Sequence, residues 1–73
     1  MAKPMDLTPE ARQGYEGKPN TYLATSPSWY AWHLGALLQK TGRTMPRDVR
    51  MGRGNSIRAN SMRFDCETWE RIE

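Results

Sequence analysis

The 73-residue chain has few of the side chains on which small enzymes, metal proteins and disulfide-linked proteins depend. Cys66 is the only cysteine, so a disulfide cannot form within the chain, and His33 is the only histidine. One cysteine and one histidine far apart in sequence do not provide a zinc site. No carboxylate lies at helical spacing from His33, whereas general acid–base catalysis requires an oriented partner. We therefore expect no enzymatic activity, no catalytic residue, no metal and no cofactor; His33 is expected to be partly packed and Cys66 to be a small buried hydrophobe.

Long apolar runs are also absent from the sequence. The first ten residues, MAKPMDLTPE, contain no apolar run, so we expect neither a signal peptide nor a membrane anchor. The longest mostly apolar stretch, residues 29–38, is about half the length that a membrane span requires. Together with the single thiol, these features predict a soluble, cytoplasmic protein without membrane contact.

Acidic residues are scarce in the middle of the chain. Residues 40–63 carry one lysine and six arginines against a single acidic residue, a balance of +6, whereas residues 64–73 have a balance of −3. Arginine forks suit phosphates and carboxylates, so this segment favours contact with a polyanion or an acidic protein surface. The arginines predicted to make this contact are Arg43, Arg47, Arg50, Arg53 and Arg58. The alternative is a solvated loop whose arginines keep the protein soluble.

The first helix is predicted by a start signal. Thr8-Pro9-Glu10 places a hydroxyl at the N-cap position, a proline at the first helical position and a carboxylate in the first turn. These residues predict a helix over about residues 9–16 that ends at Gly17.

A second helix, over about residues 27–41, is predicted by the same signal at Ser26-Pro27. On a helical wheel this segment is apolar on two sides. One side carries Tyr30, Leu34, Leu37 and Leu38, and the nearly opposite side carries Trp29, Trp32 and Ala36. Few other large apolar residues are available to cover both sides. We therefore predict that Trp29 and Trp32 bind a partner, because tryptophan is enriched at interface hot spots; the alternative is that they belong to the core.

The C-terminal half predicts a loop followed by a hairpin. Residues 43–55 are rich in arginine and glycine and contain Pro46, which is typical of a loop. Apolar and polar residues alternate on both sides of Asn60-Ser61, which predicts a β-hairpin over about residues 56–66.

The expected fold class is α+β, with two short N-terminal helices and a small C-terminal β-hairpin in a single domain of residues 1–73. Residues 67–73 form a tail that either continues the last strand or makes a helical turn. A helix-turn-helix over residues 34–63 fits badly, because Pro46 and three glycines interrupt it. A domain of this size has a modest core and a thin margin of stability.

Residues 11–35 resemble the ribosome modulation factor family, which has a glycine-rich segment, an Asn-Pro-Tyr turn and a Trp-x-x-Gly helix. The matching segments here are Gly14-Tyr15-Glu16-Gly17-Lys18, Asn20-Thr21-Tyr22 and Trp32-His33-Leu34-Gly35. Thr21 stands where that family has proline. This resemblance implies a small basic protein that binds ribosomes or nucleic acid.

The whole chain resembles the small RNA-polymerase-binding transcription regulators of Xanthomonas bacteriophages. The resemblance is carried by MAKPMDLTPE, SPSWYAWHLGALLQ, RTMPRDVRMGRGNSIR and the length of the chain. It implies a monomer in the bacterial host cytoplasm that binds RNA polymerase at the N-terminal part of the β′ subunit, near the β flap and the RNA exit channel. The implied effects are inhibition of promoter use through loss of σ and antitermination at intrinsic terminators, aided by NusA. Non-specific contact with RNA agrees with the basic segment.

Overall fold

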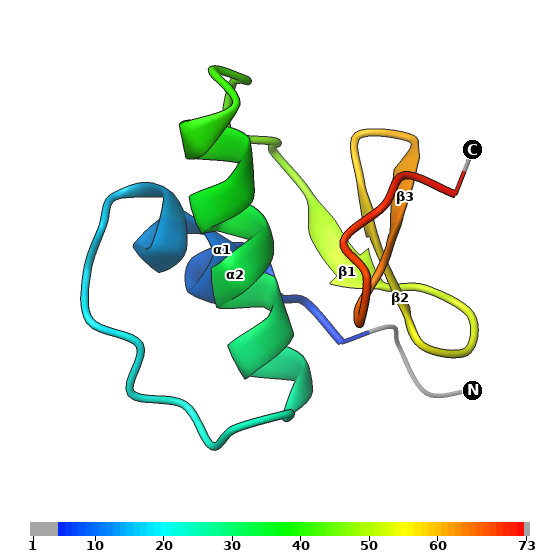
Figure 1. Ribbon diagram of the computed structural model, residues 1–73, viewed down its shortest axis with the longest axis horizontal. Helices are drawn as coiled ribbons and strands as arrows, with labels where there is room; N and C mark the ends of the chain where they lie inside the picture. Colours follow the sequence, from blue (N-terminus) through cyan, green and yellow to red (C-terminus); the bar gives the residue numbers. More distant parts are fainter. Residues whose placement is uncertain (1–4, 73) are drawn as a thin grey trace.

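Two helices and a three-stranded antiparallel sheet form the structure. The computed structural model describes residues 5–72. In chain order the elements are α1 (Thr8–Tyr15), α2 (Pro27–Lys40), β1 (Val49–Met51), β2 (Ser56–Ala59) and β3 (Met62–Asp65). The sheet order is β1-β2-β3, and the two helices lie together on one side of it (Figure 1). The predicted α+β class, with two N-terminal helices and a C-terminal hairpin, is confirmed.

Helix α2 begins as its sequence predicts. The Ser26 hydroxyl accepts a hydrogen bond from the Trp29 N–H at 3.2 Å, and Pro27 occupies the first turn. Leu34 and Leu38 lie on the side of the helix predicted to be core, and both are buried. The local start signal and the apolar stripe therefore both agree with the packed helix.

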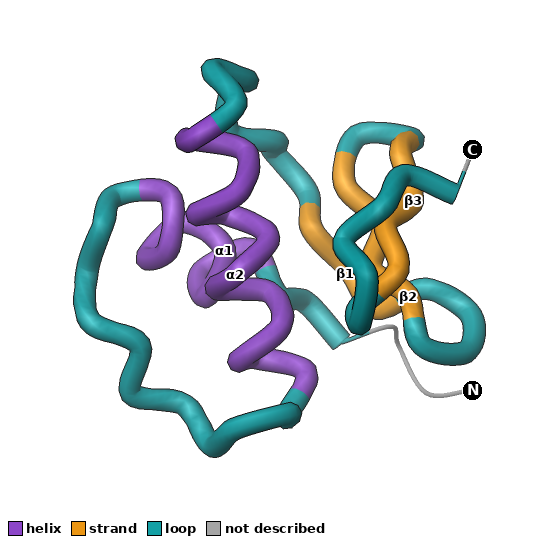
Figure 2. The backbone as a smooth tube through the Cα atoms, viewed as in Figure 1, coloured by secondary structure: helices purple, strands orange, loops and turns teal. Residues whose placement is uncertain are grey.

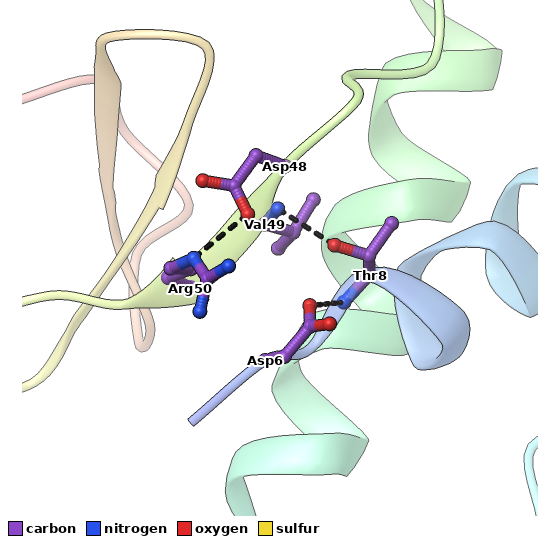
Figure 3. A network of polar contacts seen from close by, with 5 residues as sticks. All are labelled: Asp6, Thr8, Asp48, Val49 and Arg50. Atoms are coloured by element: carbon purple, nitrogen blue, oxygen red, sulfur yellow. Dashed lines mark hydrogen bonds and ion pairs between the residues drawn. The ribbon is translucent and has the colours of Figure 1, made fainter. Parts of the chain in front are cut away.

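The prediction that Thr8 caps α1 is wrong. Leu7 holds the N-cap position without a side-chain hydrogen bond, and the Asp6 carboxylate accepts one from the Thr8 N–H at 3.0 Å. The Thr8 hydroxyl instead accepts a hydrogen bond from the Val49 N–H at 3.0 Å (Figure 3). Because the Val49 carbonyl also accepts one from the Leu7 N–H at 2.8 Å, the start of α1 is joined directly to β1.

Helices α1 and α2 cross with their backbones in contact. Gly14 and Gly35 are buried at the crossing. A Cβ atom on Gly14 would collide with the carbonyl of Trp32, and one on Gly35 would collide with the carbonyl of Ala11. The absence of side chains at these two positions therefore sets how closely α2 lies against α1.

The sheet contains one strand more than the sequence predicts. The prediction of a loop over residues 43–55 is wrong for Val49–Met51, which forms β1 and pairs with β2. Val49 is completely buried and its backbone is also bonded to the start of α1, so pairing on both sides overrides the loop-like composition. In the predicted hairpin, Asn60 and Ser61 have positive φ angles of 49° and 61°, as a type I′ turn requires.

The inner face of the sheet packs against the helices. The buried core consists of Leu7, Ala11, Ala31, Leu34, Leu38, Val49, Ile57, Ala59, Phe64 and Cys66. After β3 the chain reverses near Trp69, whose φ is 61°, and returns beside β3 (Figure 2). There the Ile72 N–H donates to the Arg63 carbonyl at 2.7 Å. The Trp69 N–H also donates to the Asp65 carbonyl at 2.9 Å, which is the hydrogen bond of a single helical turn. Of the two alternatives for the tail, a longer strand is therefore wrong over its described part, and a helical turn agrees with its first residues before the chain returns. Within residues 5–72 neither helix has the length and apolar character to cross a membrane.

Candidate functional site

A row of three arginines crosses the outer face of the sheet, one from each strand. The register places Arg50 opposite Arg58, and Arg58 opposite Arg63. Residues directly opposite each other on antiparallel strands point to the same face. The other face carries Val49, Ile57 and Phe64, which are buried against the helices. The three guanidinium groups therefore belong to the face that points away from the helices; we call it the arginine face.

The remaining strand residues on the arginine face are also polar. By the alternation of the strands they are Ser56 and Asp65, which lie opposite each other. The Ser56 hydroxyl donates to the Arg53 carbonyl at 2.6 Å. The Asp65 carboxylate accepts the N–H groups of Glu67 at 2.7 Å and Thr68 at 3.1 Å, and the hydrogen bonds from Thr68 and Glu67 lower its pKa. By this alternation the strand residues of the arginine face are all polar or charged, and the half-buried Met51 of β1 is the apolar strand residue that lines a hollow beside them.

Two further carboxylates lie at the β1 end of the row. Asp48 Oδ1 is 2.8 Å from Arg50 Nε (Figure 3). The backbone of Asp6 forms an antiparallel β-bridge with that of Arg50 at the edge of the sheet. Hydrogen bonding from Thr8 lowers the pKa of Asp6, and the charge of Arg50 adds a smaller effect in the same direction. Neither carboxylate is in register with Arg58 on the central strand. The arginine row therefore keeps like charges directly opposite one another, which destabilises a sheet.

The β1–β2 loop extends the arginine face at one end. Arg53 is exposed in this loop. Together with Arg58 and Arg63 it lines a shallow hollow of about 450 Å³, whose floor includes Met51 and Gly52. Four arginines thus lie along one continuous side of the molecule.

The structure divides the five arginines predicted to act together. Arg50 and Arg58 are on the arginine face and Arg53 borders it. Arg43 follows α2, donates a hydrogen bond to the Met62 sulfur at 3.3 Å and is therefore separate. Arg47 is exposed in the segment before β1.

Arg63 was missed as a candidate site residue. A two-residue turn at Asn60-Ser61 places Arg58 and Arg63 directly opposite each other, so the predicted hairpin already contained the signal that identifies it.

A second surface feature is an aromatic cluster around His33. Its ring centroid lies 4.3 Å from that of Trp29, 5.1 Å from that of Trp32 and 6.2 Å from that of Trp69. All four side chains are half-buried, so the expectation of a partly packed histidine is confirmed. Trp69 was not predicted to join this cluster, because it comes from the irregular tail and no periodicity marks it.

The two tryptophans predicted to bind a partner have different surroundings. The Trp32 indole N–H donates to the Lys18 carbonyl at 3.0 Å and so holds the loop that follows α1. Trp29 contacts Tyr30, at a centroid distance of 5.0 Å, and His33 on its own helix. Of the two, Trp29 is the better candidate for a binding residue.

The burial and the pKa of Cys66 agree with a structural role for this residue. Cys66 is buried, and desolvation, with smaller contributions from the charges of Asp65 and Glu67, raises the pKa of its thiol to about 11. The thiol is therefore protonated at neutral pH and serves as the small buried hydrophobe that was predicted. Among residues 5–72 no group of three or more histidine, cysteine, aspartate or glutamate side chains is arranged to hold a metal ion.

In comparisons with protein families, with curated proteins and with solved structures, nothing matched the chain. The two resemblances described above therefore rest on the residues quoted for them. For the ribosome modulation factor family, Gly14 and Gly35 are among those residues, and both are explained by the helix crossing.

Proposed function

We propose that this protein is a small, non-catalytic transcription regulator that binds bacterial RNA polymerase in the N-terminal region of β′, near the β flap and the RNA exit channel. There it inhibits promoter use by displacing σ and acts as an antiterminator at intrinsic terminators, with NusA as an aid. The observation that carries the proposal is the arginine face on the outer side of the sheet, on the opposite side from the helix-packed core.

A protein at the mouth of the exit channel has protein on one side and RNA on the other. The aromatic cluster supports the protein contact, because half-buried tryptophan rings on a helix give a firm surface with a large apolar area. The arginine face supports the contact with RNA, because its charge attracts phosphates without reading bases. The resemblance of the whole chain to polymerase-binding regulators supplies the identity of the partner.

A second candidate function is binding to ribosomes, as the resemblance of residues 11–35 implies. The arginine face favours it as well, because ribosomal RNA presents the same phosphates as nascent RNA. The two candidates differ in the protein component to which the aromatic cluster binds.

Affinity capture from a bacterial lysate, followed by titration with purified RNA polymerase and purified ribosomes, separates these candidates. We expect binding to polymerase and competition with σ. Trp29→Ala should weaken polymerase binding by at least about 30-fold, equivalent to about 2 kcal/mol at a hot spot. The matched control is Leu23→Ala, at a residue that is 82% exposed in the loop before α2. Capture of ribosomes without polymerase, or equal effects of the two variants on a folded protein, contradicts the proposal.

A further inference from the structure

The composition of the arginine face distinguishes between kinds of partner. Protein interfaces are centred on aromatic or aliphatic anchors that become fully buried. The strand residues that the register places on this face are Arg50, Ser56, Arg58, Arg63 and Asp65. Met51, which lines the hollow beside them, is half-buried and packs against the core, so the strands offer no exposed aromatic or aliphatic anchor. A nucleic-acid backbone requires only donors for its phosphate oxygens, and arginine forks supply these in pairs.

Protection of the sheet edges does not explain the arginine row. Charged residues commonly guard edge strands against pairing with another chain. Arg58, however, is on the central strand β2, which is paired on both sides. Both edges are also covered, β1 by the bridge between Asp6 and Arg50 and β3 by the bridge between Phe64 and Arg71. The fold thus maintains opposed like charges at a position where edge protection does not require them.

The spacing of the row suits a flexible chain of phosphates. Neighbouring strands lie about 4.8 Å apart, so three arginines in register span about 10 Å across the sheet. Arg53 continues the row into the hollow next to Arg58 and Arg63. No aromatic side chain of the strands lies on this face, so bases have no stacking platform and sequence cannot be read there.

We infer that the arginine face is a binding site for the phosphate backbone of single-stranded RNA, with Arg50, Arg58 and Arg63 as the central contacts and Arg53 at its end. The inference deepens the proposed function, on which it rests in taking RNA at the polymerase exit channel as the natural ligand. It assigns the RNA and protein contacts to different surfaces, so each can be removed without the other.

The test is fluorescence anisotropy of a labelled single-stranded oligouridine of about 20 nucleotides, longer than the ~4–16 nucleotides that a small single-strand-binding domain covers. Each phosphate contact on a single strand contributes about −0.7 to the slope of log affinity against log salt, so we expect a slope of about −2 to −3. Removal of one contact should lower the affinity about eightfold at about 0.05 M salt and reduce the slope by about 0.7. An oligocytidine of equal length should bind equally well.

Arg58→Gln is the central variant, because Arg58 is exposed and its loss relieves repulsion within the sheet. Its thermal midpoint should stay equal or rise while its RNA affinity falls, a combination that a purely structural role does not produce. Arg12→Gln, an exposed arginine on α1, is the charge-matched control and should bind like the unchanged protein. Arg50→Gln/Arg58→Gln should lose both contacts, with Arg12→Gln/Lys18→Gln as its control.

Several outcomes overturn the inference. The first is that Arg58→Gln and Arg12→Gln weaken oligouridine binding equally. The second is that the protein binds a DNA duplex of the same length more tightly than oligouridine. The third is that it binds polyglutamate more tightly than oligouridine, which identifies an acidic protein as the partner. Binding to polymerase without binding to oligouridine overturns the inference and leaves the proposed function standing. Binding to oligouridine that Arg58→Gln weakens, without binding to polymerase, supports the site and contradicts the proposed function.

Discussion

Replacing Gly35 by alanine tests whether the helix crossing holds the domain together. On an isolated helix this change stabilises by about 1 kcal/mol, because alanine has the higher helix propensity. In the packed domain the new methyl group would lie 2.7 Å from the Ala11 carbonyl carbon and 2.9 Å from the Tyr15 nitrogen. These are backbone atoms that cannot rotate away, so we take the upper end of the ~1–3 kcal/mol cost of overpacking. Subtracting the propensity gain leaves a net loss of about 2 kcal/mol.

Thermal denaturation followed by circular dichroism measures this loss. The core of a domain of this size seldom contributes more than about 3–5 kcal/mol of stability, and 1 kcal/mol shifts the thermal midpoint by about 4–8 °C. Gly35→Ala should therefore lower the midpoint by about 8–16 °C. Gln39→Ala, exposed on the same helix, is the control and should change it little. A rise in the midpoint of Gly35→Ala would refute the close crossing, because helix propensity would then decide the outcome.

Two further predictions concern the joint between the halves and the buried thiol. Thr8→Val removes the acceptor of the buried Val49 N–H and should lower the free energy of unfolding by about 1–3 kcal/mol, measured by urea denaturation. Thr44→Val, at an exposed position, is the control and should leave the free energy of unfolding unchanged. Equal urea midpoints for the two variants would contradict the role of this hydrogen bond. The pKa of Cys66 rises from 9.0 to about 11 on folding, so above pH 9 the unfolded chain releases the thiol proton first and stability falls until about pH 11. Below pH 9 the folded and unfolded states both keep the thiol proton, so stability does not depend on pH through Cys66. Between pH 9 and about pH 11, Cys66→Ala should lose less stability than the unchanged protein. Parallel curves of stability against pH would contradict the raised pKa of Cys66.

The parts of the fold that were predictable from sequence are those specified by neighbouring residues. Ser26-Pro27 specifies the start of α2 locally, and alternation around Asn60-Ser61 specifies the hairpin. Strand β1 is different, because it has three residues and its pairing partners lie before α1 and after the next loop. The Thr8 hydroxyl was mispredicted for the same reason. Its neighbours in sequence predict a helix cap, whereas in the structure it accepts a hydrogen bond from the N–H of Val49, a strand residue far along the chain.

In the candidate site, too, the features specified by neighbouring residues were predictable and those that depend on distant residues were not. The basic charge of the middle segment was visible from composition, and Arg58 with Arg63 follows from the hairpin register. Arg50 joins them only through β1, so its place in the row was not predictable without that strand. Arg43 belongs to the same run of charge in sequence, yet the end of α2 takes it to Met62. Distance along the chain therefore did not decide which arginines lie together on one face.

The hydrogen bonds between the start of α1 and β1 join the helical half to the sheet at a second place, in addition to the segment 41–48 that connects α2 to β1. Leu7 is bonded to Val49, and the helix begins at the next residue, Thr8. These hydrogen bonds therefore oppose movement of the helices, which carry most of the aromatic cluster, relative to the sheet, which carries the arginine face. Under the proposed function, binding of polymerase at the aromatic cluster would keep the arginine face at a high effective concentration near the RNA, so two weak contacts would combine into a strong one. Loosening this joint should weaken joint binding of both ligands while leaving each separate affinity unchanged.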